Sequence, residues 1–159
     1  MATIDELIQK LKSDDENERA LAAQQLGKRR SVCVTEPLIE TLRNDPSLMV
    51  RKTAAQALGE NGDRRALQPL LDALDESKPS LRESAIRALG LLGDTRAIQP
   101  LIHELQNGSE ERLRARAAIA LSFIGDPRAV EPIANALLND PETNVRERAA
   151  IALVSIPHR

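Results

Sequence analysis

The charged residues with the most regular spacing in this chain are five arginines. They follow one another at intervals of 32, 31, 32 and 32 residues and are Arg19, Arg51, Arg82, Arg114 and Arg146. A series of guanidinium groups could bind a polyanion, but Arg also forms bidentate pairs with carboxylates. An acidic residue stands six positions before three of them, at Asp45, Glu76 and Asp140. These regular acidic residues favour a structural role for the arginines over anion binding.

Few residues of this chain could bind a metal ion or act as a nucleophile. His103 and Glu104 form one His–Glu pair, and the second histidine is His158 near the end of the sequence. A metal centre needs several converging ligands, so we expect no metal site and no cofactor, and we predict that His103 is exposed on a helix. Cys33 has no His near it in sequence, and we predict a buried or half-buried small hydrophobic residue there rather than a catalytic thiol.

All of these residues belong to a repeat of about 32 residues. When the five arginines are aligned, a second block also superposes, with Pro37, Pro69, Pro100 and Pro132 in register. Five units fill the chain, at approximately residues 1–30, 31–62, 63–93, 94–125 and 126–159. We interpret them as one domain of stacked units.

Each unit is predicted to contain two antiparallel helices. Apolar residues of the arginine-bearing segment, such as Val50 and Leu58, recur at the spacing of a buried helical stripe. The recurrent prolines lie near the start of the other helix, so we expect that helix to begin late or with a kink. The aspartates that follow Gly at three junctions are predicted caps, namely Asp63, Asp94 and Asp126.

Composition excludes several classes of protein. One Cys cannot form an internal disulfide, and no apolar run approaches the roughly 18 residues of a membrane-spanning helix. The net charge of −2 and the single Phe, with no Trp or Tyr, argue against nucleic acid as a partner. We expect a cytoplasmic protein without a membrane or nucleic-acid partner.

The repeated blocks resemble HEAT-like repeats of the short variety named after phycobilisome lyases. The resemblance is carried by DPSLMVRKTAAQALGENGDRRALQPLLDAL, SLRESAIRALGLLGDTRAIQPLIHEL and RLRARAAIALSFIGDPRAVEPIANAL. It implies an all-α, right-handed solenoid of five helix pairs, about ten helices, with the proline-bearing helices in the convex layer. The arginine-bearing helices would then line the concave layer.

The same resemblance implies an Asp–Arg ladder that links neighbouring units. Its members would be the five arginines together with Asp45, Glu76 and Asp140. Unit four has Gly108 at the acidic position. We therefore expect Arg114 to be freer than the other arginines, and Arg114→Ala to destabilise the protein less than Arg51→Ala.

The exposed face of the arginine-bearing helices is a candidate binding surface, because the repeat does not dictate its residues. Five positions per unit give six basic and three acidic residues, a local charge of +3. The candidate partner-binding residues are Lys52, Arg87, Leu91, Arg112, Arg116, Ile119, Phe123, Arg148 and Ile151. Apolar residues flanked by Arg have the composition of a binding hot spot. Phe123 has two interpretations, either on this groove or filling the junction between units four and five.

These observations favour a non-enzymatic scaffold that binds an acidic or amphipathic protein surface on its concave face. The alternative that the resemblance implies is a phycobilin lyase-like subunit or phycobilisome-associated factor. In it, Arg87, Arg116 and Arg148 would pair with the propionates of a linear tetrapyrrole, and phycobiliprotein or bilin would be the partner. The last unit has no polar closing helix, so its apolar edge predicts a homodimer, a tail folded over it, or a longer protein. The sequence does not identify the partner.

Overall fold

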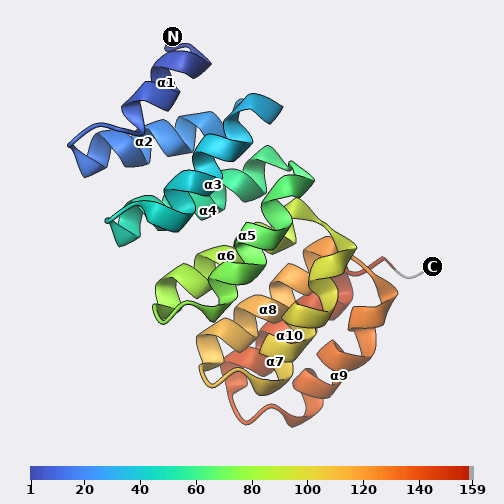
Figure 1. Cartoon of the computed structure of the whole chain (residues 1–159). Helices are drawn as coiled ribbons and strands as arrows, with labels where there is room; N and C mark the ends of the chain where they lie inside the picture. The colour runs from blue at the N-terminus through green and yellow to red at the C-terminus, as the bar shows by residue number, and fades with distance from the viewer. Residues whose placement is uncertain (158–159) are drawn as a thin grey trace.

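The computed structural model describes residues 1–157 and contains ten α-helices in that range, arranged as five successive pairs (Figure 1). The first helices of the pairs are α1 (Ile4–Lys10), α3 (Thr35–Asn44), α5 (Leu67–Asp72), α7 (Ile98–Asn107) and α9 (Val130–Asn139). The second helices are α2 (Glu16–Gly27), α4 (Leu48–Asn61), α6 (Pro79–Leu92), α8 (Glu111–Ile124) and α10 (Thr143–Ser155). The pairs stack in chain order from one end to the other, which confirms the predicted all-α solenoid.

The prediction that the proline-bearing helices begin late is confirmed. A short 3₁₀ turn precedes each of α3, α5, α7 and α9, as at Arg64–Ala66 before α5. The aspartates cap these turns rather than the α-helices, since each side chain accepts a hydrogen bond from the backbone N–H two residues later. Pro69 is the third residue of α5, where its missing N–H costs no intrahelical bond.

Glycine in the last turn of the second helices allows neighbouring units to approach closely. A Cβ on Gly59 would lie 2.7 Å from the Cα of Ala88 on α6, and a Cβ on Gly90 would lie 2.9 Å from the Cα of Ala120 on α8. Gly27 meets Ala57 in the same way. These contacts place α2, α4 and α6 almost backbone to backbone with the next second helix.

The first helices stand further apart than the second helices. Hollows of about 560, 160 and 310 Å³ lie between α1 and α3, between α7 and α9, and between α5 and α7, respectively. The second helices make the most extensive contacts between units. In a curved stack the more closely spaced layer lies on the inside of the curve. We therefore call the exposed surface of α2, α4, α6, α8 and α10 the inner face.

The recurrent arginines reach forward to the acidic residue of the next unit. Arg19 donates from Nε and Nη2 to Asp45, at 2.8 and 3.1 Å. Arg114 makes the same bidentate pair with Asp140, at 2.9 and 3.0 Å. Arg51 pairs with Glu76. The side chains of the two aspartates are only 6% and 7% exposed, so the pairs are shielded from water.

The expectation that Arg114 is freer than the other arginines is wrong. Arg19, Arg51 and Arg114 pair with the acidic residue of the following unit. The lack of a carboxylate at Gly108 therefore affects Arg82, whereas Arg114 pairs with Asp140 and also donates to the Gly108 carbonyl. Arg82 contacts Glu104 at 3.2 Å and Glu110 at 3.9 Å instead. Its buried Nε has no hydrogen-bond partner among the described residues.

Arg146 is the ladder arginine whose contacts stay within its own unit. Its Nη1 donates to the backbone oxygens of Asp140 and Pro141, at 2.8 and 2.9 Å, and its Nη2 donates to Thr143 Oγ1 at 2.9 Å. No carboxylate oxygen of residues 1–157 lies within 4.0 Å of the Arg146 guanidinium, whereas Arg114 has one at 2.9 Å. Arg146 therefore links no two units in the described structure.

Two of the predictions about isolated residues have opposite outcomes. His103 is exposed on α7, as expected. Cys33 is exposed in the 3₁₀ turn before α3, so the expected buried or half-buried position is wrong. In this turn Val34 is fully buried in the core, and the side chain of Cys33 points to solvent.

The end of the described chain returns toward the fourth unit. Ile156 is 2% exposed, and Pro157 lies close to Gly125 at the end of α8. The predicted tail beyond Pro157, with His158, lies outside the described residues. Leu138 and Val154 of the last pair remain highly exposed. No helix within residues 1–157 has the length and apolar character that crossing a membrane requires.

Candidate functional site

The inner face of α6, α8 and α10 carries a row of exposed apolar side chains. Leu91 on α6, Phe123 on α8 and Ile151 on α10 are 46%, 62% and 51% exposed. Leu91 and Phe123 each follow their recurrent arginine by nine residues, and Ile151 follows Arg146 by five. The stacking of the second helices places all three on one surface. Large apolar side chains exposed together on an otherwise charged surface are typical of a protein-binding site.

Phe123 does not fill the junction between units four and five. With 62% of its surface exposed it projects from the last turn of α8, while its neighbour Ser122 is buried and donates a hydrogen bond to the carbonyl of Ile119. The helix continues for one residue beyond Phe123 before Gly125 ends it in the left-handed conformation. The side chain of residue 123 therefore stays on the outward side of the last helical turn.

A small pocket lies beside Phe123 on the inner face. It has a volume of about 130 Å³ and is lined by Arg87, Leu91, Arg116, Ile119, Ala120 and Phe123. The apolar side chains come from α6 and α8, and the two arginines stand among them. We call these six residues the α6–α8 pocket.

A buried carboxylate pairs with two of the arginines on this face. Glu83, on α6, is 8% exposed and receives Nη2 of Arg116 at 2.9 Å on one oxygen and Nη2 of Arg112 at 2.7 Å on the other. Both arginines come from α8. The charge of +3 expected for the whole face is thus distributed unevenly, because Glu83 alone pairs with two of its six basic residues.

The remaining basic residues of the predicted face have no such partner. No carboxylate of residues 1–157 forms an ion pair with Lys52, Arg87 or Arg148 within 4.0 Å. Arg87 and Arg148 are exposed, and Lys52 is half-buried. Arg87 is therefore the cation of the α6–α8 pocket that is open to a ligand.

The structure brings part of the predicted site together. Five of the predicted residues line the α6–α8 pocket, and Arg112 is joined to them through Glu83. Lys52, Arg148 and Ile151 lie on the inner face of neighbouring helices but do not line the pocket. The sequence interpretation missed the role of Glu83. Its position immediately after a ladder arginine, one repeat before Arg116, was the available signal.

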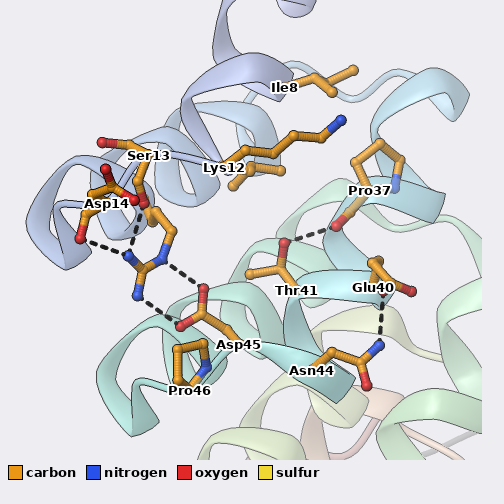
Figure 2. Close-up of a pocket in the computed structure, with 12 residues that line it drawn as sticks. Ile8, Lys12, Ser13, Asp14, Pro37, Glu40, Thr41, Asn44, Asp45 and Pro46 are labelled. Carbon is orange, nitrogen blue, oxygen red and sulfur yellow. Dashed lines mark hydrogen bonds and ion pairs between the residues drawn. The ribbon is translucent and has the colours of Figure 1, made fainter.

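A larger hollow lies on the other side of the molecule, between α1 and α3 (Figure 2). Ile8, Lys12, Pro37 and Glu40 line it. Asp45 lies at one end, where dashed lines mark its hydrogen bonds from Arg19 of α2. Asp45 is thus already paired with Arg19. No group of three or more metal-binding side chains occurs within the described part of the chain.

Asp–Arg pairs between residues two apart lie in the 3₁₀ turns before α5, α7 and α9. Hydrogen bonds from the Arg96 side chain and backbone lower the pKa of Asp94 to about 2, against burial that raises it. Arg128 likewise lowers the pKa of Asp126 to about 2. Hydrogen bonds from Arg65 are the largest cause of the lowered pKa of Asp63, which also accepts the hydroxyl of Thr35 at 2.8 Å. These carboxylates are structural caps.

A stack of helix pairs, joined by buried Arg–carboxylate pairs and with an exposed apolar and basic inner face, defines a helical repeat protein of the solenoid class. The chain belongs to the HEAT repeat family, since the family model described as HEAT repeats matches residues 4–85 and 68–154. The two matches together cover almost the whole chain.

Solved structures similar to this chain are also solenoids. A chain in the complex of CpcE and CpcF of phycocyanin lyase from Nostoc sp. PCC7120 has a TM-score of 0.80 and 28% sequence identity. The match covers 98% of this chain and 65% of that one. A designed armadillo repeat protein has a TM-score of 0.62 and 21% identity, covering 97% of this chain and 82% of its own. That second likeness concerns the fold alone. No curated protein sequence matches this chain.

Proposed function

We propose that this chain is a non-enzymatic scaffold that binds another protein on its inner face. The observation that carries the proposal is the exposed row of Leu91, Phe123 and Ile151, with Arg87 and Arg148 free to pair with a partner. Protein interfaces are enriched in aromatic residues and Arg, and a few such residues supply most of the binding energy. Phe123 is the single aromatic residue of the chain and is largely exposed.

The test is affinity capture from a native lysate with two matched double variants. Arg87→Glu/Phe123→Ser changes the inner face, and Arg43→Glu/Val32→Ser makes comparable changes at exposed positions of α3 and of the 3₁₀ turn before it. The proposal predicts a partner that wild type and the second variant retain and the first loses. A partner lost by both variants, or by neither, contradicts binding through the inner face.

The alternative function is that of a phycobilin lyase-like subunit or a phycobilisome-associated factor of the phycobilisome-lyase type. It is supported by the likeness to the phycocyanin lyase chain, over nearly the whole of this chain. Arg87, Arg116 and Arg148 would pair with the propionates of a bilin, and Ile119, Phe123 and Ile151 would cover its rings. The α6–α8 pocket, at about 130 Å³, is smaller than the roughly 300 Å³ from which ligand pockets begin. A bilin would therefore lie across the open face.

Mixing the purified protein with a bilin and an apo-phycobiliprotein separates the two functions. The lyase alternative predicts a change in bilin absorbance and transfer of the pigment, both reduced by Phe123→Ser. The scaffold proposal predicts neither.

We also propose that the edge of the last pair, where Leu138 and Val154 are 76% and 83% exposed, is a contact between two copies. Light scattering of the purified chain over a range of concentrations tests this. A dimer that Leu138→Ser/Val154→Ser converts to monomer supports it, and a monomeric mass at high concentration contradicts it.

A further inference from the structure

We infer that the inner face selects an acidic amphipathic helix of another protein, and that Glu83 limits how strongly that helix binds. In this complex one aliphatic side chain enters the α6–α8 pocket and a neighbouring carboxylate pairs with Arg87. This inference rests on the proposed scaffold function and specifies the chemistry of the partner.

The volume and lining of the pocket fit one apolar side chain. An engineered protein cavity of about 150 Å³ holds a single benzene molecule, and the α6–α8 pocket measures about 130 Å³. Leu91, Ile119, Ala120 and Phe123 supply its apolar surface. The pocket therefore accepts a side chain of the size of Leu or Ile, in contact with four apolar neighbours.

The charges around the pocket favour a carboxylate beside that side chain. Arg87 lines the pocket, is exposed and has no ion pair with residues 1–157. Arg116 lines it too, but its guanidinium already contacts Glu83. A partner carboxylate can thus pair with Arg87 without displacing an existing bond. A partner lysine at the same place would face two arginines.

The length of the apolar row sets the length of the partner segment. Leu91, Phe123 and Ile151 come from the second helices of three successive pairs, α6, α8 and α10. The axes of neighbouring packed helices are separated by about 8–10 Å. The row therefore spans roughly 16–20 Å, which a helix covers in about 11–13 residues at 1.5 Å per residue. Arg148 on α10 stands at the far end of the row, where it can pair with a second carboxylate of the partner.

Glu83 occupies the place that a partner carboxylate would take on Arg112 and Arg116. Its two oxygens contact one arginine each, at 2.7 and 2.9 Å. Removing its negative charge while keeping its shape would leave both arginines without a carboxylate partner and make this part of the face more positive by one charge. The structure thus predicts that Glu83→Gln increases the affinity for an acidic partner. A variant that failed to fold would lose affinity, so this result could not come from misfolding.

The experiment measures fluorescence anisotropy with a labelled helical peptide of about 14 residues, in which Leu recurs at i, i+4, i+7 and i+11 and Glu flanks each Leu. A second peptide has Lys in place of every Glu. At about 50 mM salt, where charge pairs are weakly screened, we expect the Glu peptide to bind and the Lys peptide not to bind.

Four variants test the individual residues against the Glu peptide. Arg87→Gln should weaken binding at least fivefold, Phe123→Ser should abolish it, and Glu83→Gln should tighten it at least threefold. Arg43→Gln, an exposed position on α3, is the matched control and should bind as wild type does. Circular dichroism confirms that each variant is folded.

Equal binding of the two peptides, no binding of the Glu peptide, or unchanged or weaker binding by Glu83→Gln would overturn the inference. If lysate capture nevertheless depends on Phe123, the scaffold function stands and only the acidic-helix inference fails. If capture fails as well, the proposed function itself is wrong.

Discussion

Replacing the fourth ladder arginine should destabilise the protein much more than replacing the fifth. Arg114→Ala removes both bonds to Asp140 and the bond to the Gly108 carbonyl. It leaves the Asp140 carboxylate, 7% exposed, without its cation. Removing one partner of a buried pair costs about 3–5 kcal/mol. Because the Asp140 carboxylate still accepts a hydrogen bond from the backbone N–H of Glu142, we expect a cost of about 3 kcal/mol for Arg114→Ala.

Arg146→Ala removes bonds to backbone oxygens and one hydroxyl of its own unit and leaves no carboxylate unpaired. Its cost should be about 1 kcal/mol, as for ordinary hydrogen bonds. The difference of about 2 kcal/mol corresponds to roughly 4–8 °C in the melting temperature of a chain of this size.

Urea unfolding followed by circular dichroism measures both costs, and hydrogen exchange localises them. Because a repeat protein depends on contacts between neighbours, Arg114→Ala should accelerate exchange of the α10 amides. Arg43→Ala, whose pair with Asp72 is 3.9 Å long and exposed, is the control and should cost less than about 0.5 kcal/mol. Equal losses for Arg114→Ala and Arg146→Ala would refute the forward direction of the ladder.

Three further predictions follow from the packing and the caps. Gly59→Ala should cost more than about 2 kcal/mol in urea unfolding, because its Cβ would meet backbone 2.7 Å away, whereas Gly93→Ala meets no atom within 4 Å and should cost only the roughly 1 kcal/mol of its left-handed backbone. Since Arg96 lowers the pKa of Asp94 from 3.8 to about 2, this carboxylate stabilises the fold above about pH 4 and progressively less as pH falls to 2. The Asp94→Asn variant should therefore be less stable than wild type at pH 7 and should lose less of its free energy of unfolding between pH 4 and pH 2. If the stability of the two proteins falls in parallel over this pH range, the prediction is wrong. Phe123→Ala should leave the melting temperature nearly unchanged, because the side chain is 62% exposed; a loss of several degrees would show that it supports the fold.

The fold could be predicted because the same local signals recur in every unit. Regular spacing of Arg19 and its four equivalents, apolar stripes and glycine-bearing junctions all indicate helix pairs at one fixed interval. The direction of the ladder could not be predicted in the same way. For each arginine the acidic position of its own unit and that of the next unit are both candidates. Only the stacked structure shows that Asp140 lies within reach of Arg114.

The site was predicted as a set of residues on a face, but its internal pairing was not. Helical spacing assigns Arg116 and Glu83 to the same surface, yet it does not show that their side chains meet across two units. Phe123 had two possible orientations, because a residue in the last helical turn can face either the junction or solvent. Its exposure depends on where Gly125 ends α8, a property of the three-dimensional packing.

The glycine contacts between second helices determine where the solenoid can bend. With Gly59 and Gly90 almost touching the backbone of the next helix, the inner layer resists compression, whereas the hollows between the first helices leave that layer room to open and close. Bending therefore pivots about the inner layer and changes the outer one. The Gly90 contact joins α6 to α8, so the spacing of Leu91 and Phe123 should stay nearly constant during such motion. A partner then meets a preorganised surface there and loses little affinity to ordering it.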